Sequence, residues 1–468
     1  MPSDHRDWNA LAWTYLQSGQ NELALDAAQR AHQASRNNLE YLNTLGVAYG
    51  EAGDLERAES SFRKALKRKP VFLDALINLA KTLEKQERFA EAIPLYERAL
   101  ALDEAFPKLA TNLANLYRAR GDAKRARELL ERFARHIDPQ DLALALAACD
   151  YELAGIGAAI DRLSTAVKQH PEWNAATNAL AHACLADGRW RDGWHYYLAR
   201  HSSTAAALPA RLDGERILLR GEQGIGDVLF FLRFAPLLKA RGATFSVVCP
   251  KKLHGVIGAP AMETEAPGFD RQLLLGDLPV HLECYETPSA WPLTARNEGR
   301  AKLEALGRGP YLAVTWRAGT DTARGREFGA ERMSLTKALP PEELGAALRG
   351  WKGTAILLQR GARAGEVERF SSAFGAQCHD LSALGDDLPM LLAVLAEIDE
   401  YVTVSNTNVH LLAGLGRTAR VLIPYPAEWR WMRRDGRSPW FPDFPVYRQP
   451  QSRAWQQALR ELRRDLGL

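Results

Sequence analysis

Leucine and small residues recur every 34 positions in the first part of the chain. The leucines of this pattern are Leu11, Leu45, Leu79 and Leu113. The residue after each of them is small: Ala12, Gly46, Ala80 and Ala114. A second series of small residues keeps the same spacing, at Ala24, Ala58, Ala92 and Ala126. Because a large residue fills a helix interface and a small one lets the partner helix approach, the repeat predicts stacked helix pairs.

Four copies of the repeat are clear, from about residue 5 to residue 140, and two weaker copies follow at 144–171 and 177–197. Gly53-Asp54 and Gly121-Asp122 fit the turn inside a helix pair, since glycine ends one helix and aspartate caps the next. The pattern resembles the tetratricopeptide repeat, whose arrays bind peptides or proteins on a concave face.

The pattern changes after residue 200. The segment 201–214 interrupts the helical periodicity and is typical of a linker. Short β-rich runs then alternate with amphipathic stretches, which predicts parallel α/β sheets. The expected strands are 215–220, 243–250, 311–317, 355–359, 401–405 and 419–425, and the expected helices are 228–242, 388–398, 408–416 and 452–468. The predicted organisation is a repeat array at 1–200, one α/β half at 213–305, a second at 306–450 and a final helix at 451–468.

Composition narrows the class of protein. With 46% hydrophobic and 25% charged residues, the 468-residue chain is neither disordered nor fibrous. A net charge of +3 gives no global field that would favour a nucleic-acid partner. The five cysteines lie far apart, without metal-ligand spacing. We expect no membrane span, because no apolar run approaches the required length, and we expect a cytoplasmic location.

A glycine-rich loop, Gly221-Glu222-Gln223-Gly224-Ile225-Gly226-Asp227, follows the first predicted strand and opens a helix. Glycine there permits close approach of the backbone to a ligand. The spacing is neither a dinucleotide fingerprint nor a P-loop. The alternative is a purely structural turn in which Asp227 caps the following helix.

A second turn joins the strand 401–405 to a helix with a small-residue face. It reads Ser405-Asn406-Thr407-Asn408-Val409-His410. Free N–H groups and the helix dipole make such a terminus an anion site. The alternative is that Ser405, Asn406 or Thr407 only caps the helix and that His410 packs against the sheet.

Two further segments carry cations near predicted strand ends. Arg317 follows the strand 311–317 and could bind phosphate with its guanidinium fork, or it could be a surface residue. Trp429 and Arg430, within 428–434, could stack a base and neutralise phosphate. For the tryptophans of that segment, packing between domains is the favoured interpretation.

Together these segments resemble the bacterial proteins that join tetratricopeptide repeats to a glycosyltransferase domain of GT-B fold. That domain is similar to the ADP-heptose:lipopolysaccharide heptosyltransferases and, more distantly, to O-GlcNAc transferase. The residues that carry the resemblance lie at 221–243, 314–320, 404–424 and 428–442. The resemblance implies an α-helical solenoid followed by two Rossmann-like halves that face each other across a cleft.

The resemblance also implies roles for particular residues. Asp227 corresponds to the general base, with Glu222 as the fallback, and Gly221, Gln223, Gly224 and Gly226 complete the acceptor-side loop. The implied donor-binding residues are Arg317, Ser405, Asn406, Thr407, Asn408, His410, Trp429 and Arg430. Relatives often have an aspartate where this chain has Ser405-Asn406. No metal is implied, because the helix dipole and cations can stabilise the leaving diphosphate.

The sequence therefore predicts a metal-independent glycosyltransferase whose co-substrate is a nucleotide-sugar and which needs no other cofactor. The expected acceptor is a protein held by the concave face of the repeats, and by resemblance it is flagellin or another surface protein. Two alternatives remain open: a non-catalytic adaptor with a degenerate GT-B domain, and an enzyme acting on lipid or polysaccharide.

Overall fold

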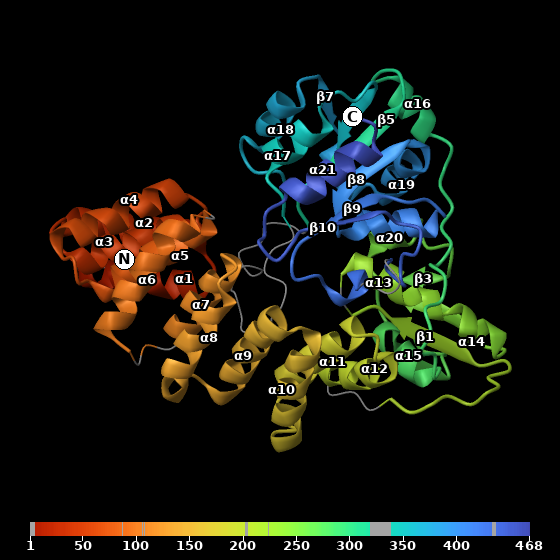
Figure 1. Cartoon of the computed structure of the whole chain (residues 1–468), viewed down its shortest axis with the longest axis horizontal. Coiled ribbons are helices and arrows are strands. Elements are labelled where there is room, and N and C mark those ends of the chain that lie inside the picture. The colour runs from red at the N-terminus through yellow and green to blue at the C-terminus, as the bar shows by residue number, and fades with distance from the viewer. Residues whose placement is uncertain are drawn as a thin grey trace. The chain divides into compact units, whose positions relative to one another are not determined.

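The computed structural model of the chain describes residues 5–86, 88–104, 106, 108–201, 205–222, 224–318, 338–432 and 437–468. These residues form two compact units, one reaching residue 149 and the other beginning at residue 150. The described secondary structure of the first unit is helical, whereas the second combines helices with two sheets (Figure 1).

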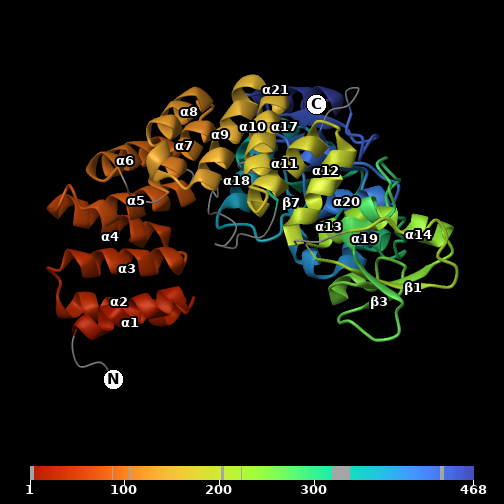
Figure 2. The same cartoon turned by 90° about the horizontal axis from the view of Figure 1, so that it is seen from below.

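The first unit is built from consecutive antiparallel helices. They are α1 (His5–Gln17), α2 (Asn21–Ala34), α3 (Leu39–Glu51), α4 (Leu55–Arg68), α5 (Leu73–Lys85), α6 (Phe89–Leu102), α7 (Leu109–Ala119) and α8 (Ala123–Arg132). Each odd-numbered helix packs on the even-numbered helix that follows it, and neighbouring pairs pack on each other. Figure 2 shows the first of these helices as successive layers. The predicted stack of helix pairs is confirmed.

The small residues of the 34-residue pattern form the interior of this stack. Those of the second series, Ala24, Ala58, Ala92 and Ala126, are fully buried. Gly46 faces Phe62 so closely that a β-carbon there would lie 2.6 Å from Phe62 Cε1. The pattern therefore marks the positions at which two helices of one pair approach each other.

The predicted turns are also present. Gly53 has a φ of 88°, and Asp54 Oδ1 accepts a hydrogen bond of 3.0 Å from Arg57 N. Gly121 has a φ of 80°, and Asp122 caps α8 in the same way. Glycine and aspartate thus have the positions that the sequence predicts for ending one helix and starting the next.

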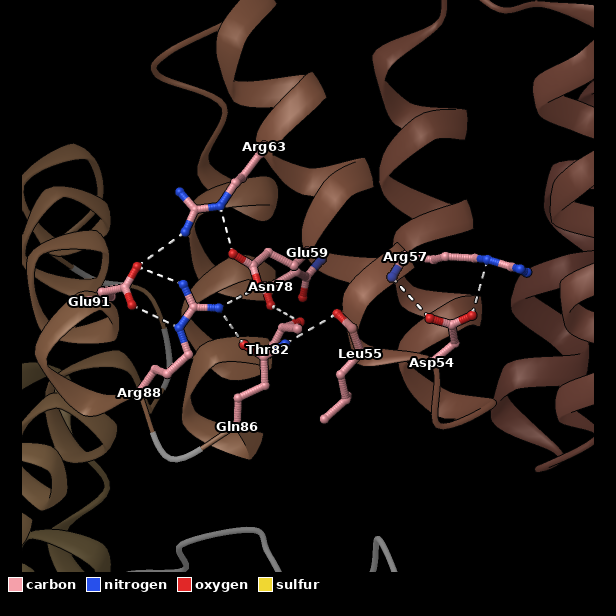
Figure 3. A network of polar contacts seen from close by, with 10 residues as sticks. All are labelled: Asp54, Leu55, Arg57, Glu59, Arg63, Asn78, Thr82, Gln86, Arg88 and Glu91. Carbon is pink, nitrogen blue, oxygen red and sulfur yellow. Dashed lines mark hydrogen bonds and ion pairs between the residues drawn. The ribbon is translucent and has the colours of Figure 1, made fainter. Parts of the chain in front are cut away.

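Polar contacts on α4 and α6 connect neighbouring repeats (Figure 3). Arg88, just before α6, lies 2.6 Å from Glu59 Oε2 on α4 and 2.7 Å from Glu91 Oε1 on its own helix. Arg63 on α4 bridges the same two carboxylates, at 2.7 and 3.3 Å. Since most of these side chains are partly exposed, the network contributes little to the stability of the stack.

Four helices separate the stack from the first sheet. α9 (Pro139–Ala154) spans the limit between the two units, and α10 (Ile156–Gln169), α11 (Asn174–Ala186) and α12 (Trp190–Tyr197) belong to the second. The ring of Trp194 on α12 lies edge-on to Phe231 and Trp429, with centroids 5.8 and 5.4 Å apart. Because α11 and α12 share a core with the α/β region, the limit between compact units falls at residue 149, whereas the helical segment itself continues to residue 201.

The first sheet consists of four parallel strands. They are β1 (Arg216–Arg220), β2 (Thr244–Val248), β3 (Ala261–Met262) and β4 (Arg271–Leu274). Their order is β3-β2-β1-β4. From β1 the chain adds β2 and β3 on one side and then returns to add β4 on the other side. The switch point therefore lies between β1 and β4, at their carboxyl ends. In doubly wound sheets such a switch point is where ligands bind.

The second sheet has six parallel strands. They are β5 (Tyr311–Thr315), β6 (Thr354–Leu357), β7 (Cys378–Asp380), β8 (Glu400–Val404), β9 (Arg420–Ile423) and β10 (Val446–Arg448). The order β10-β9-β8-β5-β6-β7 corresponds to that of a Rossmann fold, with the switch point between β5 and β8. The prediction of parallel α/β structure is confirmed.

The helices of the α/β region surround these sheets. They are α13 (Ile225–Phe231), α14 (Pro236–Ala240), α15 (Leu278–His281), α16 (Gly299–Glu304), α17 (Pro341–Leu348), α18 (Glu366–Phe374), α19 (Leu388–Glu397), α20 (Thr407–Gly414) and α21 (Gln456–Asp465). The single helix predicted for 228–242 is divided into α13 and α14 by a 3-10 turn that precedes Pro236. The reason is that proline donates no backbone hydrogen bond.

Candidate functional site

The glycine-rich loop lies at the switch point of the first sheet. Gly221 N donates to Val248 O at 2.9 Å, and a β-carbon on Gly221 would lie 2.7 Å from Val228 Cγ2. The loop therefore needs glycine at position 221 to turn tightly from β1 into α13. Gln223, part of the predicted acceptor-side loop, lies outside the described residues.

Asp227 does not cap a helix. Gly224 is the N-cap residue of α13, so Asp227 is the third residue of the helix. The Asp227 carboxylate instead forms an ion pair with the Arg430 guanidinium, with side chains that are 29% and 13% exposed. Capping by Asp227, one part of the structural alternative, is therefore not observed, and the carboxylate is partly accessible at the carboxyl edge of the first sheet.

Arg430 lies in the 3-10 turn η8 (Trp429–Trp431). Its guanidinium stacks over the rings of Phe230 and Trp429, with its central carbon 4.8 and 4.3 Å from their centroids. Stacking on two aromatic rings and pairing with a carboxylate fix the orientation of the guanidinium plane. Trp429 itself is 5% exposed, so the packing interpretation of this tryptophan is the one observed.

The strand-end turn of the second sheet lies at the switch point between β5 and β8. Asn406 is the N-cap of α20, and its Oδ1 accepts from Asn408 N at 2.9 Å. Ser405 Oγ donates to Glu428 Oε1 at 2.5 Å. Asn408 Nδ2 donates to Tyr401 OH at 2.8 Å. Capping by Asn406 is therefore observed: it occupies the backbone N–H of Asn408, and Val409 N donates to Asn406 O at 3.3 Å.

The two turns meet through α13 and α20. A β-carbon on Gly226 would lie 3.3 Å from His410 Cδ2 and 3.6 Å from Thr407 Oγ1. His410 packs edge-on against Phe441 and Phe230, at centroid distances of 5.4 and 6.0 Å. Residues predicted for the acceptor side and for the donor side are thus neighbours, although 203 positions separate Asp227 from Arg430.

Arg317 is engaged within its own sheet. Its Nη2 donates to Gly361 O at 2.8 Å and pairs with Glu366 Oε2 at 3.1 Å. Burial raises the pKa of Glu366, but hydrogen bonds from Arg363 N and from Arg317 outweigh it, so the pKa lies below its usual value. Arg317 follows β5 directly, where the sheet has its switch point, and its guanidinium is already neutralised there by Glu366.

A second arginine lies under Arg430. Arg233 is 2% exposed, stacks on the Phe230 ring at 4.2 Å, and donates to Phe230 O and Trp440 O at 3.0 and 3.3 Å. Burial and the charge of Arg430 lower the pKa of Arg233 to about 9. Carbonyl oxygens and an aromatic face therefore hold a buried cation next to the Asp227–Arg430 pair.

Glu222 forms a second, more deeply buried charge cluster. Its carboxylate pairs with Arg200, and its Oε2 lies 2.5 Å from His201 Nε2. Arg200 also lies 2.7 Å from Asp277 Oδ1, and Gly276 N donates to Glu222 Oε1 at 3.1 Å. Since the Glu222 side chain is only 11% exposed and is paired, it is poorly placed to accept a proton from a substrate.

Sequence reasoning did not find Arg200, Asp277, Glu366 or Glu428. These residues lie outside the glycine loop and the strand-end turn, and each becomes a partner only in three dimensions. The position of Asp277 directly after β4, a strand that was not predicted, is the one local signal available.

Neither a metal-binding cluster nor a membrane-spanning helix is found in the described part of the chain. It holds no group of three or more His, Cys, Asp or Glu side chains placed to bind a metal ion. None of its helices combines the length and apolar character needed to cross a bilayer.

The fold and these loops define a protein in which helical repeats precede a parallel α/β unit. Comparison with known sequences identifies the type of repeat. Two tetratricopeptide repeat profiles match residues 43–110 and 83–150. The helices within residues 43–150 therefore match tetratricopeptide repeats, a module that points to protein partners.

Relatives match different parts of the chain. Protein FlbA of Caulobacter vibrioides is 24% identical over 524 aligned positions, covering 95% of this chain and 82% of FlbA. Tetratricopeptide repeat protein 14 of Mus musculus is 30% identical over 111 positions, 22% of this chain and 14% of the mouse protein. A solved tetratricopeptide repeat protein from Parabacteroides merdae covers 51% of this chain and 89% of its own, with 13% identity and a TM-score of 0.38. A TM-score this low adds nothing to the argument about function.

Proposed function

We propose that the α/β unit is a glycosyltransferase that moves a sugar from a nucleoside-diphosphate sugar to a hydroxyl group of an acceptor protein bound by the repeats. One observation carries the proposal. The turn after β1 and the turn after β8, at the switch points of two doubly wound sheets, meet at Gly226 and His410. The Asp227 carboxylate, assigned here to the acceptor side, thereby lies beside the Arg430 cation, assigned to the donor side.

The donor diphosphate binds at the N-terminus of α20 in this proposal. Backbone N–H groups of the first helical turn and the helix dipole attract its charge. Arg430, 13% exposed, is the nearby cation. When the diphosphate binds, it competes with Asp227 for the guanidinium and so frees the carboxylate.

Asp227 acts as the general base. The acceptor oxygen forms a bond to the anomeric carbon while the bond from that carbon to the diphosphate oxygen breaks. The acceptor proton passes to the Asp227 carboxylate, and the electron pair of the broken bond stays on the diphosphate, whose charge Arg430 and α20 stabilise.

A non-catalytic adaptor is the second candidate function. It is favoured by the pairing of both arginines at the site, Arg317 with Glu366 and Arg430 with Asp227. In that case the pairs are structural, and the repeats alone mediate the activity by binding a partner protein.

A screen of nucleotide-sugars separates the two functions. The full chain is incubated with UDP-, GDP-, ADP- and TDP-sugars, with and without candidate acceptor proteins, and release of free nucleoside diphosphate is measured. We expect one donor to be hydrolysed, faster in the presence of its acceptor. Absence of turnover and of nucleotide binding by calorimetry across the whole set would favour the adaptor.

A further inference from the structure

The buried charge cluster around Glu222 connects the helical part of the second unit to the glycine-rich loop. Arg200 belongs to the 3-10 turn η2 (Leu198–His201), directly after α12. Glu222 belongs to the loop after β1, and Asp277 follows β4. Three segments that are far apart in the sequence thus place charged side chains at one switch point.

Arg200 is the cation that holds this arrangement together. The side chains of Arg200, Glu222 and Asp277 are 6%, 11% and 2% exposed. Two carboxylates that are buried side by side repel each other and lose their hydration, and the Arg200 cation between them offsets both costs. Burial lowers the pKa of Arg200, but the hydrogen bond with Glu222 and the charge of Asp277 outweigh burial and raise the pKa above its usual value.

The orientation of Arg200 is fixed from its own side. Its Nη1 donates to Tyr197 O at 2.8 Å, and its guanidinium lies 4.3 Å from the Tyr197 ring centroid. The last turn of the helical segment therefore determines where the Glu222 carboxylate lies. Arg200 is thus held in place by Tyr197, and it in turn holds Glu222 of the glycine-rich loop.

Gly276 shows how closely the cluster is packed. A β-carbon at Gly276 would lie 2.4 Å from Arg200 Nη2 and 2.6 Å from Glu222 Oε1. The backbone after β4 can approach the ion pair and donate its N–H to Glu222 only because position 276 has no side chain. The same cluster thus pins the loop to β4 as well as to α12.

Among the described residues of the loop, 221, 222 and 224–227, backbone hydrogen bonds hold its two ends. Gly221 N donates to Val248 O, and the next described hydrogen bonds are those of Asp227 N and Val228 N to Gly224 O, at the start of α13. Glu222 is therefore one of the attachments that fix the path of the loop into α13, together with the packing of α13 on α20 and the pair of Asp227 with Arg430.

We propose that Arg200 is a positioning residue: by holding Glu222 and Asp277 it fixes the glycine-rich loop, and so the carboxylate of Asp227. Its effect on turnover rests on the proposed function, whereas its effect on the loop does not. Glu222 is then a structural acid of the loop and not a substitute base.

Hydrogen exchange tests the placement without any need for activity. Arg200→Gln removes the charge and Arg200→Lys keeps it without the planar fork. We expect backbone amides of residues 221–228 to exchange about tenfold faster in Arg200→Gln, with a smaller increase in Arg200→Lys, while α19 and the repeats are unchanged. The matched control is Arg211→Gln, because Arg211 pairs with Asp213 at 2.7 Å on the surface, with side chains 84% and 59% exposed.

Turnover gives the second measurement once a donor is known. We expect kcat of Arg200→Gln to fall about tenfold or more while KM for the donor stays the same, since the donor binds at α20. If Arg200→Gln does not fold, Gly276→Ala and Arg200→Lys disturb the cluster with its charges kept, and the same two measurements apply. Wild-type exchange at residues 221–228 in every folded variant, or an equal rise in all parts of the chain, would overturn the proposal. Faster loop exchange together with no turnover in the wild type would uphold the placement and reject the glycosyltransferase function.

Discussion

The contacts of Asp227 bear on whether it has a structural role, as a helix cap, or a chemical one, as a base. It stands within the first turn of α13, and Gly224 precedes it as the N-cap. Its partner is Arg430, which an anionic ligand at α20 could also bind. If a bound anion takes over Arg430, the Asp227 carboxylate loses its partner and can accept a proton. A capping aspartate would stay bonded to its helix whether or not a ligand is bound.

Asp227→Asn is therefore expected to affect turnover far more than stability. Asparagine cannot accept a proton at neutral pH, so kcat should fall at least about a hundredfold. Loss of the ion pair should lower the free energy of unfolding by about 1 kcal/mol. Donor turnover and chemical denaturation measure the two effects. Asp213→Asn, at an exposed pair, is the control, and near-normal turnover of Asp227→Asn would remove Asp227 from the mechanism.

Glu84 makes the stability of the repeats dependent on pH. Burial raises its pKa to about 7, although a hydrogen bond from Tyr96 and the charge of Lys81 act in the opposite direction. The folded state binds the proton more tightly than the unfolded chain, whose value is near 4.5. The free energy of unfolding should thus fall as pH rises from about 4.5 to 7 and then level off.

Glu84→Gln should remove this pH dependence. Its amide oxygen can still accept the Tyr96 hydroxyl proton, and no charge has to be buried. At pH 8 we expect the variant to be more stable than the wild type by about 1–3 kcal/mol, with little difference at pH 4.5. Urea denaturation followed by circular dichroism at the two pH values checks this. A difference of the same size at both pH values would show that the ionisation of Glu84 does not matter.

At the scale of helices and strands, burial decides what the sequence can predict. The six strands that were predicted, β1, β2, β5, β6, β8 and β9, occupy central positions in their sheets. Those that were missed, β3, β4, β7 and β10, are the edges. An edge strand is half covered, so it lacks the continuous apolar run of a central parallel strand.

The same reasoning explains how much of the site was predictable. The glycine loop and the Ser405 turn could be placed because each directly follows a buried central strand. Their partners could not, since Arg430 is 203 positions from Asp227 and Glu366 is 49 from Arg317. Local pattern contains no information about such pairs, which arise only when sheets and helices pack.

The helix pair α3–α4 offers a test of the small-residue rule within one helix. Gly46→Ala would place a methyl group 2.6 Å from the buried Phe62 ring, whereas at Gly50 the nearest atom is Ala58 Cβ at 3.7 Å. We expect Gly46→Ala to destabilise the protein by about 1–3 kcal/mol through overpacking. Gly50→Ala should stabilise it by about 0.5–1 kcal/mol, because alanine is the better helix former. Thermal unfolding compares the two, and equal effects would contradict the packing role of Gly46.

At the scale of the whole molecule, the helices α11 and α12, which precede the first sheet, are part of the folded α/β region. Trp194 and Arg200 supply part of its core and of its charge cluster. We expect a fragment of residues 139–468 to fold and to retain nucleotide binding, while a fragment of residues 201–468 fails to fold. Circular dichroism and calorimetry with nucleoside diphosphates check this. A stable, nucleotide-binding fragment 201–468 would show that the shared core is dispensable.

The packing of Trp194 against Trp429 and Trp440 also has an optical consequence. The three indoles lie edge-on within 5.8 Å of one another, in surroundings with little water. Their fluorescence therefore emits at short wavelength, and their mutual proximity makes it sensitive to small displacements. The three come from α12, from η8 and from the segment before β10, but the chain has 12 tryptophans in all. A red shift of emission that is lost in Trp194→Phe therefore reports separation of these segments without any added label.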